Sequence, residues 1–340
     1  MARYALPLSV SGQAVALRAG LPSARLSLGG ELPSEPRTPI SAGRLETYGR
    51  ATLRVLDALD GPLPAGPPTR DLSVAKKILP EWAVRLLVAG LLLPATLMAG
   101  DGLARLYRRG QPLAGALAWV AGLALPFAAA VLLARVLALT GAIPDLSPAP
   151  PPGAVPLDGA AWTALGCCAA LLALVAVLLR PALARRMAGA AGSAPLAVLL
   201  VSCALAWLCW IGNPYAALLL VLPVNTWLLL ADGARPRRSL AVALVLASLA
   251  PVGVVVGVYA GALSMGAGEI PWFWMLAVAG GAVAVPAALL WCVGAGAATA
   301  ALLLALRPAA AAGERPVTVR GPLSYAGPGS LGGTDSAIRR

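Results

Sequence analysis

Long apolar runs separated by short polar connections occupy the chain from Trp82 onward. Each run holds about 20 residues, the length with which an α-helix crosses roughly 30 Å of hydrocarbon. The pattern predicts about seven transmembrane helices. They are expected near residues 82–100, 113–134, 160–179, 195–211, 216–231, 239–259 and 273–306. The last run is too long for one upright helix. Because no polar break divides it, we expect one crossing that tilts, kinks at Pro286 or continues along the inner surface.

The first 80 residues are more polar and follow a different pattern. Two short extended stretches are expected between Val15 and Leu28, around the turn Gly20-Leu21-Pro22. From Ala42 to Leu59 apolar residues recur at near-helical spacing, which predicts an amphipathic helix. About 80 residues with one helix and two short strands form a poor independent core. We therefore interpret this segment as a short α/β remnant, the end of a larger domain.

The composition is that of a membrane protein. Hydrophobic residues make up 59% of the 340 positions and charged residues 12%, whereas an average soluble domain is roughly 45–50% apolar and about 25% charged. The mean hydropathy is +0.81. Histidine is absent and lysine occurs only at Lys76 and Lys77, which excludes chemistry that needs an imidazole or an intramembrane lysine Schiff base. A retinal photoreceptor is disfavoured because residues 273–306 contain no lysine.

All five cysteines fall inside apolar runs, at Cys167, Cys168, Cys203, Cys209 and Cys292. An odd number of cysteines without histidine argues against a disulfide framework or a zinc site. We interpret them as small apolar residues. The sequence therefore assigns no residue to catalysis, to a cofactor or to a metal.

Arginine is distributed unevenly among the connections. One set carries Arg105, Arg108, Arg109, Arg180, Arg185, Arg186, Arg235, Arg237 and Arg238, and it continues in the tail with Arg307, Arg315 and Arg320. The alternate connections, 142–159, 212–215 and 260–272, contain no lysine or arginine. Because positive charges near span ends stay in the cytoplasm, we expect a plasma-membrane protein with its N-terminal segment outside and its C-terminus inside. Lys76, Lys77 and Arg85 are the exception, since they lie outside near the first span.

This asymmetry also changes the meaning of the positive balance of the chain. Lysine and arginine number 26 against 14 aspartates and glutamates, which in a soluble protein would suggest nucleic acid. Here the arginines are interpreted as topology determinants. We expect the lipid bilayer as a partner and no nucleic acid.

Two polar side chains inside the runs are candidates for function. Arg135 is either a functional intramembrane charge or, as the polar loop two turns away favours, a side chain that snorkels to the outer headgroups. Asn225 is either a substrate contact or, as we favour, an amide that bonds to a neighbouring helix.

Prolines and glycines carry a second pair of alternatives. Prolines interrupt five spans, which either marks the broken helices of a transporter or reflects the frequency of proline in membrane helices. These prolines are Pro94, Pro126, Pro223, Pro251 and Pro286. Gly253, Gly257 and Gly261 have G-x-x-x-G spacing, which predicts a groove for close packing of another helix. Acidic residues inside the predicted spans and an internal repeat, both typical of transporters, are missing.

Short motifs in both parts of the chain resemble one known family. Gly20-Leu21-Pro22 is similar to the G-I-P-like turn of the di-zinc exopeptidases, the M-28 aminopeptidases, and Arg37-Thr38-Pro39 to their H-T-P-like stretch. The helix Ala42–Leu59 follows where that fold ends. Lys77 to Arg85, and Asn213-Pro214-Tyr215 through Leu222-Pro223, resemble the membrane part of bacterial proteins that join such a domain to several spans.

One departure limits what this resemblance implies. The family's last zinc ligand is a histidine, but Arg37 stands in its place, and arginine does not ligate zinc. The other ligands would lie upstream of Met1. The resemblance thus implies a metallopeptidase-like chain without a complete catalytic site. We expect the coding DNA before Met1 to continue, intact or decayed, into a peptidase-like domain.

These observations predict an all-α polytopic membrane protein preceded by an extracytoplasmic remnant. The expected parts are a peptidase-like remnant at 1–80, a transmembrane domain at 81–306 and a disordered cytoplasmic tail at 307–340. The expected function is a membrane anchor or scaffold that presents its own or a separate peptidase-like domain. A transporter or channel subunit is the alternative, and a receptor or sensor is a third.

Overall fold

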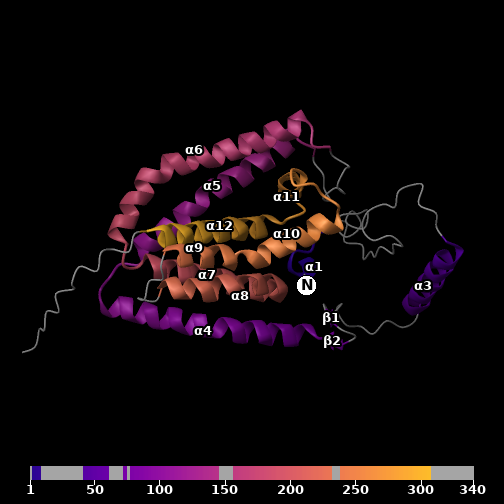
Figure 1. The fold of residues 1–340 in the computed structure, drawn as a ribbon, viewed down its shortest axis with the longest axis horizontal. Coiled ribbons are helices and arrows are strands. Elements are labelled where there is room, and N and C mark those ends of the chain that lie inside the picture. The colour runs from indigo at the N-terminus through magenta and orange to yellow at the C-terminus, as the bar shows by residue number, and fades with distance from the viewer. Residues whose placement is uncertain are drawn as a thin grey trace, which may run out of the picture. The chain divides into compact units, whose positions relative to one another are not determined.

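The computed structural model describes residues 2–8, 41–60, 72–74, 77–144, 156–231 and 238–307, all within a compact unit that ends at Arg307. Apolar helices form a bundle (Figure 1). Its members are α4 (Glu81–Arg108), α5 (Ala114–Leu139), α6 (Gly159–Gly189), α7 (Ala194–Gly212), α8 (Pro214–Ala231), α9 (Arg238–Ser248), α10 (Ala250–Ala262), α11 (Glu269–Ala279) and α12 (Val285–Leu306). They are preceded by α1 (Ala2–Ala5), α3 (Ala42–Asp60), β1 (Leu72–Val74) and β2 (Lys77–Leu79).

The bundle has the lengths and surface of a multi-pass membrane protein. Five helices, α4, α5, α6, α7 and α12, are long and apolar enough to cross a membrane, and α9 with α10 makes a sixth if this pair, bent by 44°, is one span. The helices α8 and α11 are apolar but shorter. Leu97 on α4 and Leu178 on α6 are each about two thirds exposed. Such side chains suit lipid rather than water.

Each predicted apolar run coincides with helix, but three runs differ from expectation. The run predicted at 160–179 continues as helix to Gly189, so Arg180, Arg185 and Arg186 lie on the last turns of α6. The run predicted at 239–259 is divided at Leu249 into α9 and α10.

The run predicted at 273–306 as one crossing consists of two helices, the short α11 and the membrane-length α12. The chain turns after α11 at Gly280 and Gly281, and Gly281 has φ of 76°, a backbone conformation that glycine adopts without strain. The amide of Val283 donates to the carbonyl of Ala277 at 3.0 Å and closes the end of α11. Pro286 lies in the first turn of α12, where a proline starts a helix rather than kinking it.

Close packing of small residues occurs at a different place from the one predicted. Around Gly253, Gly257 and Gly261 no described atom lies within 4 Å of where a Cβ would be, so the predicted groove holds no helix among the described residues. The buried face of α10 carries Val255 and Tyr259 instead.

Helix α12 makes its close contact with α5. A Cβ on Gly296 would lie 2.7 Å from the backbone N of Ala124 and 2.8 Å from its Cα. Real side chains do not approach a backbone so closely, so the two helices are near enough that only glycine fits at this position. The contact fixes α12 against the middle of α5, which leads from one end of the bundle to the other.

The described part of the first 80 residues is small. The predicted helix is confirmed as α3, whose Leu45, Leu53 and Leu56 are exposed. An antiparallel hairpin of β1 and β2, with Leu72 opposite Leu79, was not predicted. The extended stretches expected between Val15 and Leu28, the Arg37-Thr38-Pro39 motif and the tail beyond Arg307 lie outside the described residues.

Candidate functional site

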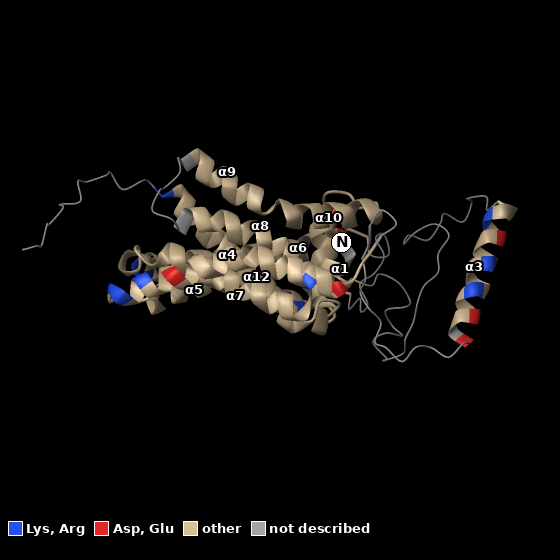
Figure 2. Ribbon diagram, turned by 90° about the horizontal axis from the view of Figure 1, so that it is seen from below, with Lys and Arg blue, Asp and Glu red and all other residues tan. Residues whose placement is uncertain are grey.

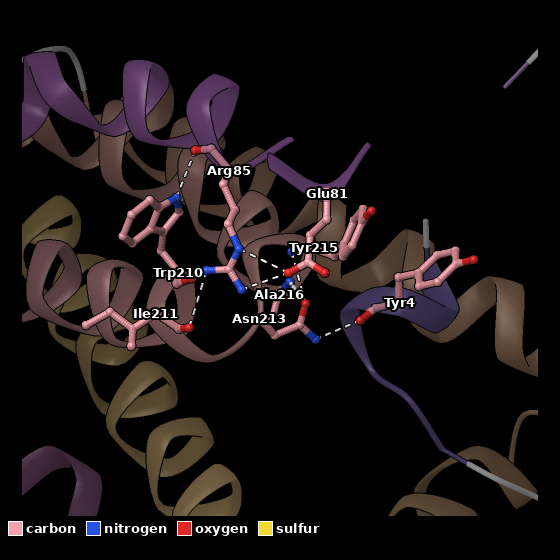
Figure 3. A network of polar contacts seen from close by, with 8 residues as sticks. All are labelled: Tyr4, Glu81, Arg85, Trp210, Ile211, Asn213, Tyr215 and Ala216. Atoms are coloured by element: carbon pink, nitrogen blue, oxygen red, sulfur yellow. Dashed lines mark hydrogen bonds and ion pairs between the residues drawn. The ribbon is translucent and has the colours of Figure 1, made fainter. Parts of the chain in front are cut away.

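Charged residues lie mainly at the two ends of the helix bundle, and the length between them is apolar (Figure 2). We call one the arginine end, where α4 and α6 finish with Arg105, Arg108, Arg185 and Arg186. We call the other the Asn213 end, after the residue that connects α7 to α8. The polar contacts that join distant parts of the chain concentrate at the Asn213 end (Figure 3).

Arg85 joins the start of α4 to the end of α7. Its Nη2 and Nε lie 2.8 and 3.0 Å from Glu81 Oε1, and its Nη1 donates to the carbonyls of Trp210 and Ile211 at 3.1 and 3.4 Å. The indole N–H of Trp210 returns a bond of 2.9 Å to the carbonyl of Arg85 (Figure 3). The last carbonyls of a helix lack internal partners and carry partial negative charge, so this guanidinium caps α7. Arg85, one of the three basic residues that depart from the predicted charge asymmetry, therefore has a structural role.

Asn213 uses both ends of its side-chain amide. Its Oδ1 accepts from the backbone N–H groups of Tyr215 at 3.0 Å and Ala216 at 3.4 Å, which caps the start of α8. Since those partners are donors, the oxygen must face them and the Nδ2 must face away. The Nδ2 donates to the carbonyls of Tyr4 at 2.7 Å and Ala5 at 3.3 Å (Figure 3). One side chain therefore orders the hairpin and holds the chain's beginning.

Tyr259 on α10 holds the next residues of that beginning. Its hydroxyl donates to the carbonyl of Leu6, and that hydroxyl oxygen accepts from the amide N–H of Leu8 at 3.5 Å. The ring of Tyr4 stacks on that of Tyr215, with centroids 5.0 Å apart, and Ala5 is only 4% exposed. Residues 4–8 are thus bound to α8 and α10 rather than merely lying near them.

An aromatic cluster lies beneath this segment. The ring of Trp274 contacts Tyr259 at 5.7 Å and Trp291 at 5.8 Å between centroids, both edge to face. Leu6 and Leu8, like Trp274 and Trp291, pack against a buried core that includes Tyr259 and Phe273. Among the described residues, the buried indole N–H groups of Trp272 and Trp274 have no hydrogen-bond partner.

The two polar candidates from the sequence have structural partners. Arg135 donates from Nη2 to the carbonyl of Val283 at 2.8 Å, so it ties α5 to the turn between α11 and α12. The favoured interpretation of Asn225 is confirmed, because its Nδ2 donates to the carbonyl of Leu91 on α4 at 3.3 Å as well as to that of Val221 on its own helix at 2.8 Å.

The prolines divide into two groups. Pro94, Pro126 and Pro223 lie inside continuous helices. Pro251 and Pro286 lie in the first turns of α10 and α12, directly after a break in the chain's helical path. Only these two are compatible with broken spans.

The chemistry available at the Asn213 end is hydrogen bonding to a polypeptide backbone. Within the part of the chain that the structure describes, no group of three or more His, Cys, Asp or Glu could hold a metal ion. The five cysteines are free thiols. The donors of Asn213 and Tyr259 are directed at main-chain carbonyls. From the sequence, Asn213 was named only within the motif Asn213-Pro214-Tyr215, and Tyr259 was not named as a site residue.

No protein-family model matches the chain, and neither a curated protein nor a solved structure matches it. The likeness to the M-28 aminopeptidases therefore stays a prediction from short motifs.

Proposed function

We propose that the chain is a multi-pass membrane scaffold that holds its own N-terminal segment against the extracytoplasmic end of the helix bundle. The observation that carries this proposal is the set of bonds from Asn213 and Tyr259 to the carbonyls of Tyr4, Ala5 and Leu6. Backbone groups bound by a helix bundle fix the direction in which the following residues leave it. A scaffold requires that property.

The proposed topology places the Asn213 end outside and the arginine end in the cytoplasm. Seven crossings, with α8 as one span and α9 with α10 as another, bring every arginine-rich connection to the same side. The arginine asymmetry supports this arrangement, because positive charges near span ends are retained in the cytoplasm. In a plasma membrane the N-terminal segment then lies outside and the C-terminus inside.

The motif resemblance adds a proposed identity for what is held. Residues 1–80 would be the end of an M-28-like peptidase domain, and the bundle its membrane anchor. With Arg37 in place of a histidine ligand, the chain itself would have no peptidase activity. The exposed Leu45, Leu53 and Leu56 of α3 are compatible with a helix from a larger domain.

A transporter or channel subunit is the second candidate, favoured by the 44° bend between α9 and α10. Discontinuous helices surround the midplane sites of many transporters. A transporter should be stabilised against heat by its small-molecule substrate, whereas a scaffold should respond only to a polypeptide.

The scaffold proposal is tested on the intact chain carrying an engineered protease site within residues 61–71. After cleavage, the fragment ending near Asp60 should stay with the membrane part through detergent purification. The double variant Asn213→Asp, Tyr259→Phe should release it, because both donors to the main chain are lost. Glu46→Gln, on the exposed surface of α3, is the control that should retain the fragment. Release of the unaltered fragment would contradict the proposal.

A further inference from the structure

The bonds to residues 4–6 read the main chain rather than side chains. Asn213 donates to two successive carbonyls, those of Tyr4 and Ala5, and Tyr259 donates to the third, that of Leu6. Any residue presents such a carbonyl, so these donors recognise a polypeptide as such. The hydrogen bonding therefore does not require residues 2–8 in particular.

Both donors are held in place by contacts that do not involve the segment. The side chain of Asn213 is fixed by the backbone N–H groups of Tyr215 and Ala216. Its backbone N–H donates to the carbonyl of Cys209 at 2.6 Å. Tyr259 is 2% exposed, with its ring against Trp274. A site whose donors are already oriented loses little freedom when a ligand enters, which favours binding.

Side-chain contacts impose a pattern on what the site accepts. The ring of Tyr4 stacks on that of Tyr215, so a ligand needs an aromatic residue at this position. Ala5 is 4% exposed within a cluster of buried residues, which leaves room only for a small residue. Leu6 and Leu8 pack against the buried cluster that includes Tyr259 and Phe273. The favoured ligand thus presents an aromatic residue, a small residue and a leucine in succession.

The segment itself has no means of keeping its shape. Helix α1 has four residues, far fewer than the roughly 12–15 below which isolated helices are marginal in water. Its conformation therefore depends on the bundle, as the conformation of a bound peptide depends on its receptor.

We propose that the Asn213 end is a peptide-binding site, and that residues 2–8 are its tethered and exchangeable occupant. The partner it fits is an extracytoplasmic polypeptide segment with the aromatic, small, leucine pattern. This rests on the proposed scaffold function, in which the same contacts act within one chain. The tethered segment is present at high effective concentration and competes with any free peptide. A separate peptide should therefore bind measurably once residues 1–8 are removed from the chain.

The test uses the chain without residues 1–8, purified in detergent, and the fluorescent peptide Ala-Arg-Tyr-Ala-Leu-Pro-Leu. Fluorescence anisotropy should show binding at least about tenfold tighter than to the full chain, in which the site is occupied. Tyr259→Phe in the shortened chain should weaken binding by up to about tenfold, the effect of one hydrogen bond. Tyr107→Phe is the matched control, since Tyr107 is 87% exposed, and it should leave binding unchanged.

Two further arms complete the design. A peptide with tryptophan in place of its second alanine should not bind. If the shortened chain fails to fold, the full chain with Ala5→Trp replaces it, because a bulky residue in the closed Ala5 site should expel the tethered segment. Equal binding by the wild-type and tryptophan peptides, or no gain over the full chain, would overturn the inference. If the cleaved fragment stays bound but the free peptide does not bind, only the exchange of the segment is refuted. If the unaltered fragment is released after cleavage, the proposed scaffold function is refuted as well.

Discussion

The two ends of the bundle use charge in opposite ways. At the arginine end, Arg105 pairs with Asp101 one turn away on the same helix, and both side chains are about half exposed. At the Asn213 end, Arg85 also pairs one turn away, with Glu81, but both side chains are about one third exposed or less, and the guanidinium bonds two carbonyls of α7. The first arrangement leaves charges to water, and the second connects separate helices.

This difference separates two roles of polar residues in a membrane protein. Exposed arginines need no particular partner to stay on one side of a bilayer. Arg85, Asn213 and Tyr259 depend on partners more than a hundred residues away in the chain. A functional site is therefore expected at the end of the bundle where the polar contacts are long-range.

The largest expected effect is all or none and concerns which end faces out. Single cysteines introduced at Pro151 and Ala267 should react with a membrane-impermeant maleimide in intact cells, whereas one at Ala234 should not, because arginine-rich connections stay inside. Permeabilised cells should label all three and serve as the control. Labelling of Ala234 in intact cells would reverse the orientation.

The next effect compares the two paired arginines. Arg85→Ala removes the bonds to α7 as well as the pairing with half-buried Glu81, so we expect the bundle to lose about 2–3 kcal/mol of stability. Arg105→Ala removes an exposed pair and should cost about 0–1 kcal/mol. Unfolding of both purified variants in parallel denaturant titrations measures the difference. Equal losses would abolish the distinction between the ends.

A third effect concerns the part of the bundle that links the ends. Gly296→Ala places a Cβ within 3 Å of the α5 backbone, and such overpacking typically costs about 1–3 kcal/mol. Gly253→Ala is the matched control, because nothing described lies within 4 Å of its Cβ position. Thermal unfolding should separate the two substitutions. A larger loss at Gly253 would show that the G-x-x-x-G face is packed against another molecule.

The smallest expected effect is none. The purified chain should contain no stoichiometric zinc, hydrolyse no aminoacyl substrate and keep its thermal midpoint in a chelator, because Arg37 replaces the ligand that the family resemblance requires. Arg37→His should not restore activity, since one ligand is far from a complete site. Metal analysis and a peptidase assay check both statements. Chelator-sensitive hydrolysis of an aminoacyl substrate would contradict both.

The sequence predicted the helices far better than their contacts. Apolar runs of about 20 residues have one solution in lipid, the helix, so their positions follow from hydropathy. Gly280 and Gly281 gave no sign of a turn, because glycine is frequent inside membrane helices. The spacing of Gly253 and Gly257 did not reveal which face of α10 is turned inward.

The candidate site was beyond such reasoning for a related reason. Asn213 and Tyr4 are 209 residues apart, and a local pattern carries no information about which distant carbonyl an amide will meet. Asn213 was recognisable as a turn residue and Tyr259 as an aromatic near a span end. Their joint use on residues 4–6 depends on how α8 and α10 pack around α1, which only the folded chain defines.

The cap on α7 also sets an order of events during synthesis. Arg85 and Trp210 are 125 residues apart, so at about 5–20 residues per second the ribosome needs about 6–25 s to make the second after the first. During that interval, of the partners that the structure describes for the guanidinium, only Glu81, four residues away on α4, has been made. In the proposed orientation this ion pair is inserted before α7 exists. Glu81 would then offset the charge of Arg85 until the carbonyls of α7 become its further partners.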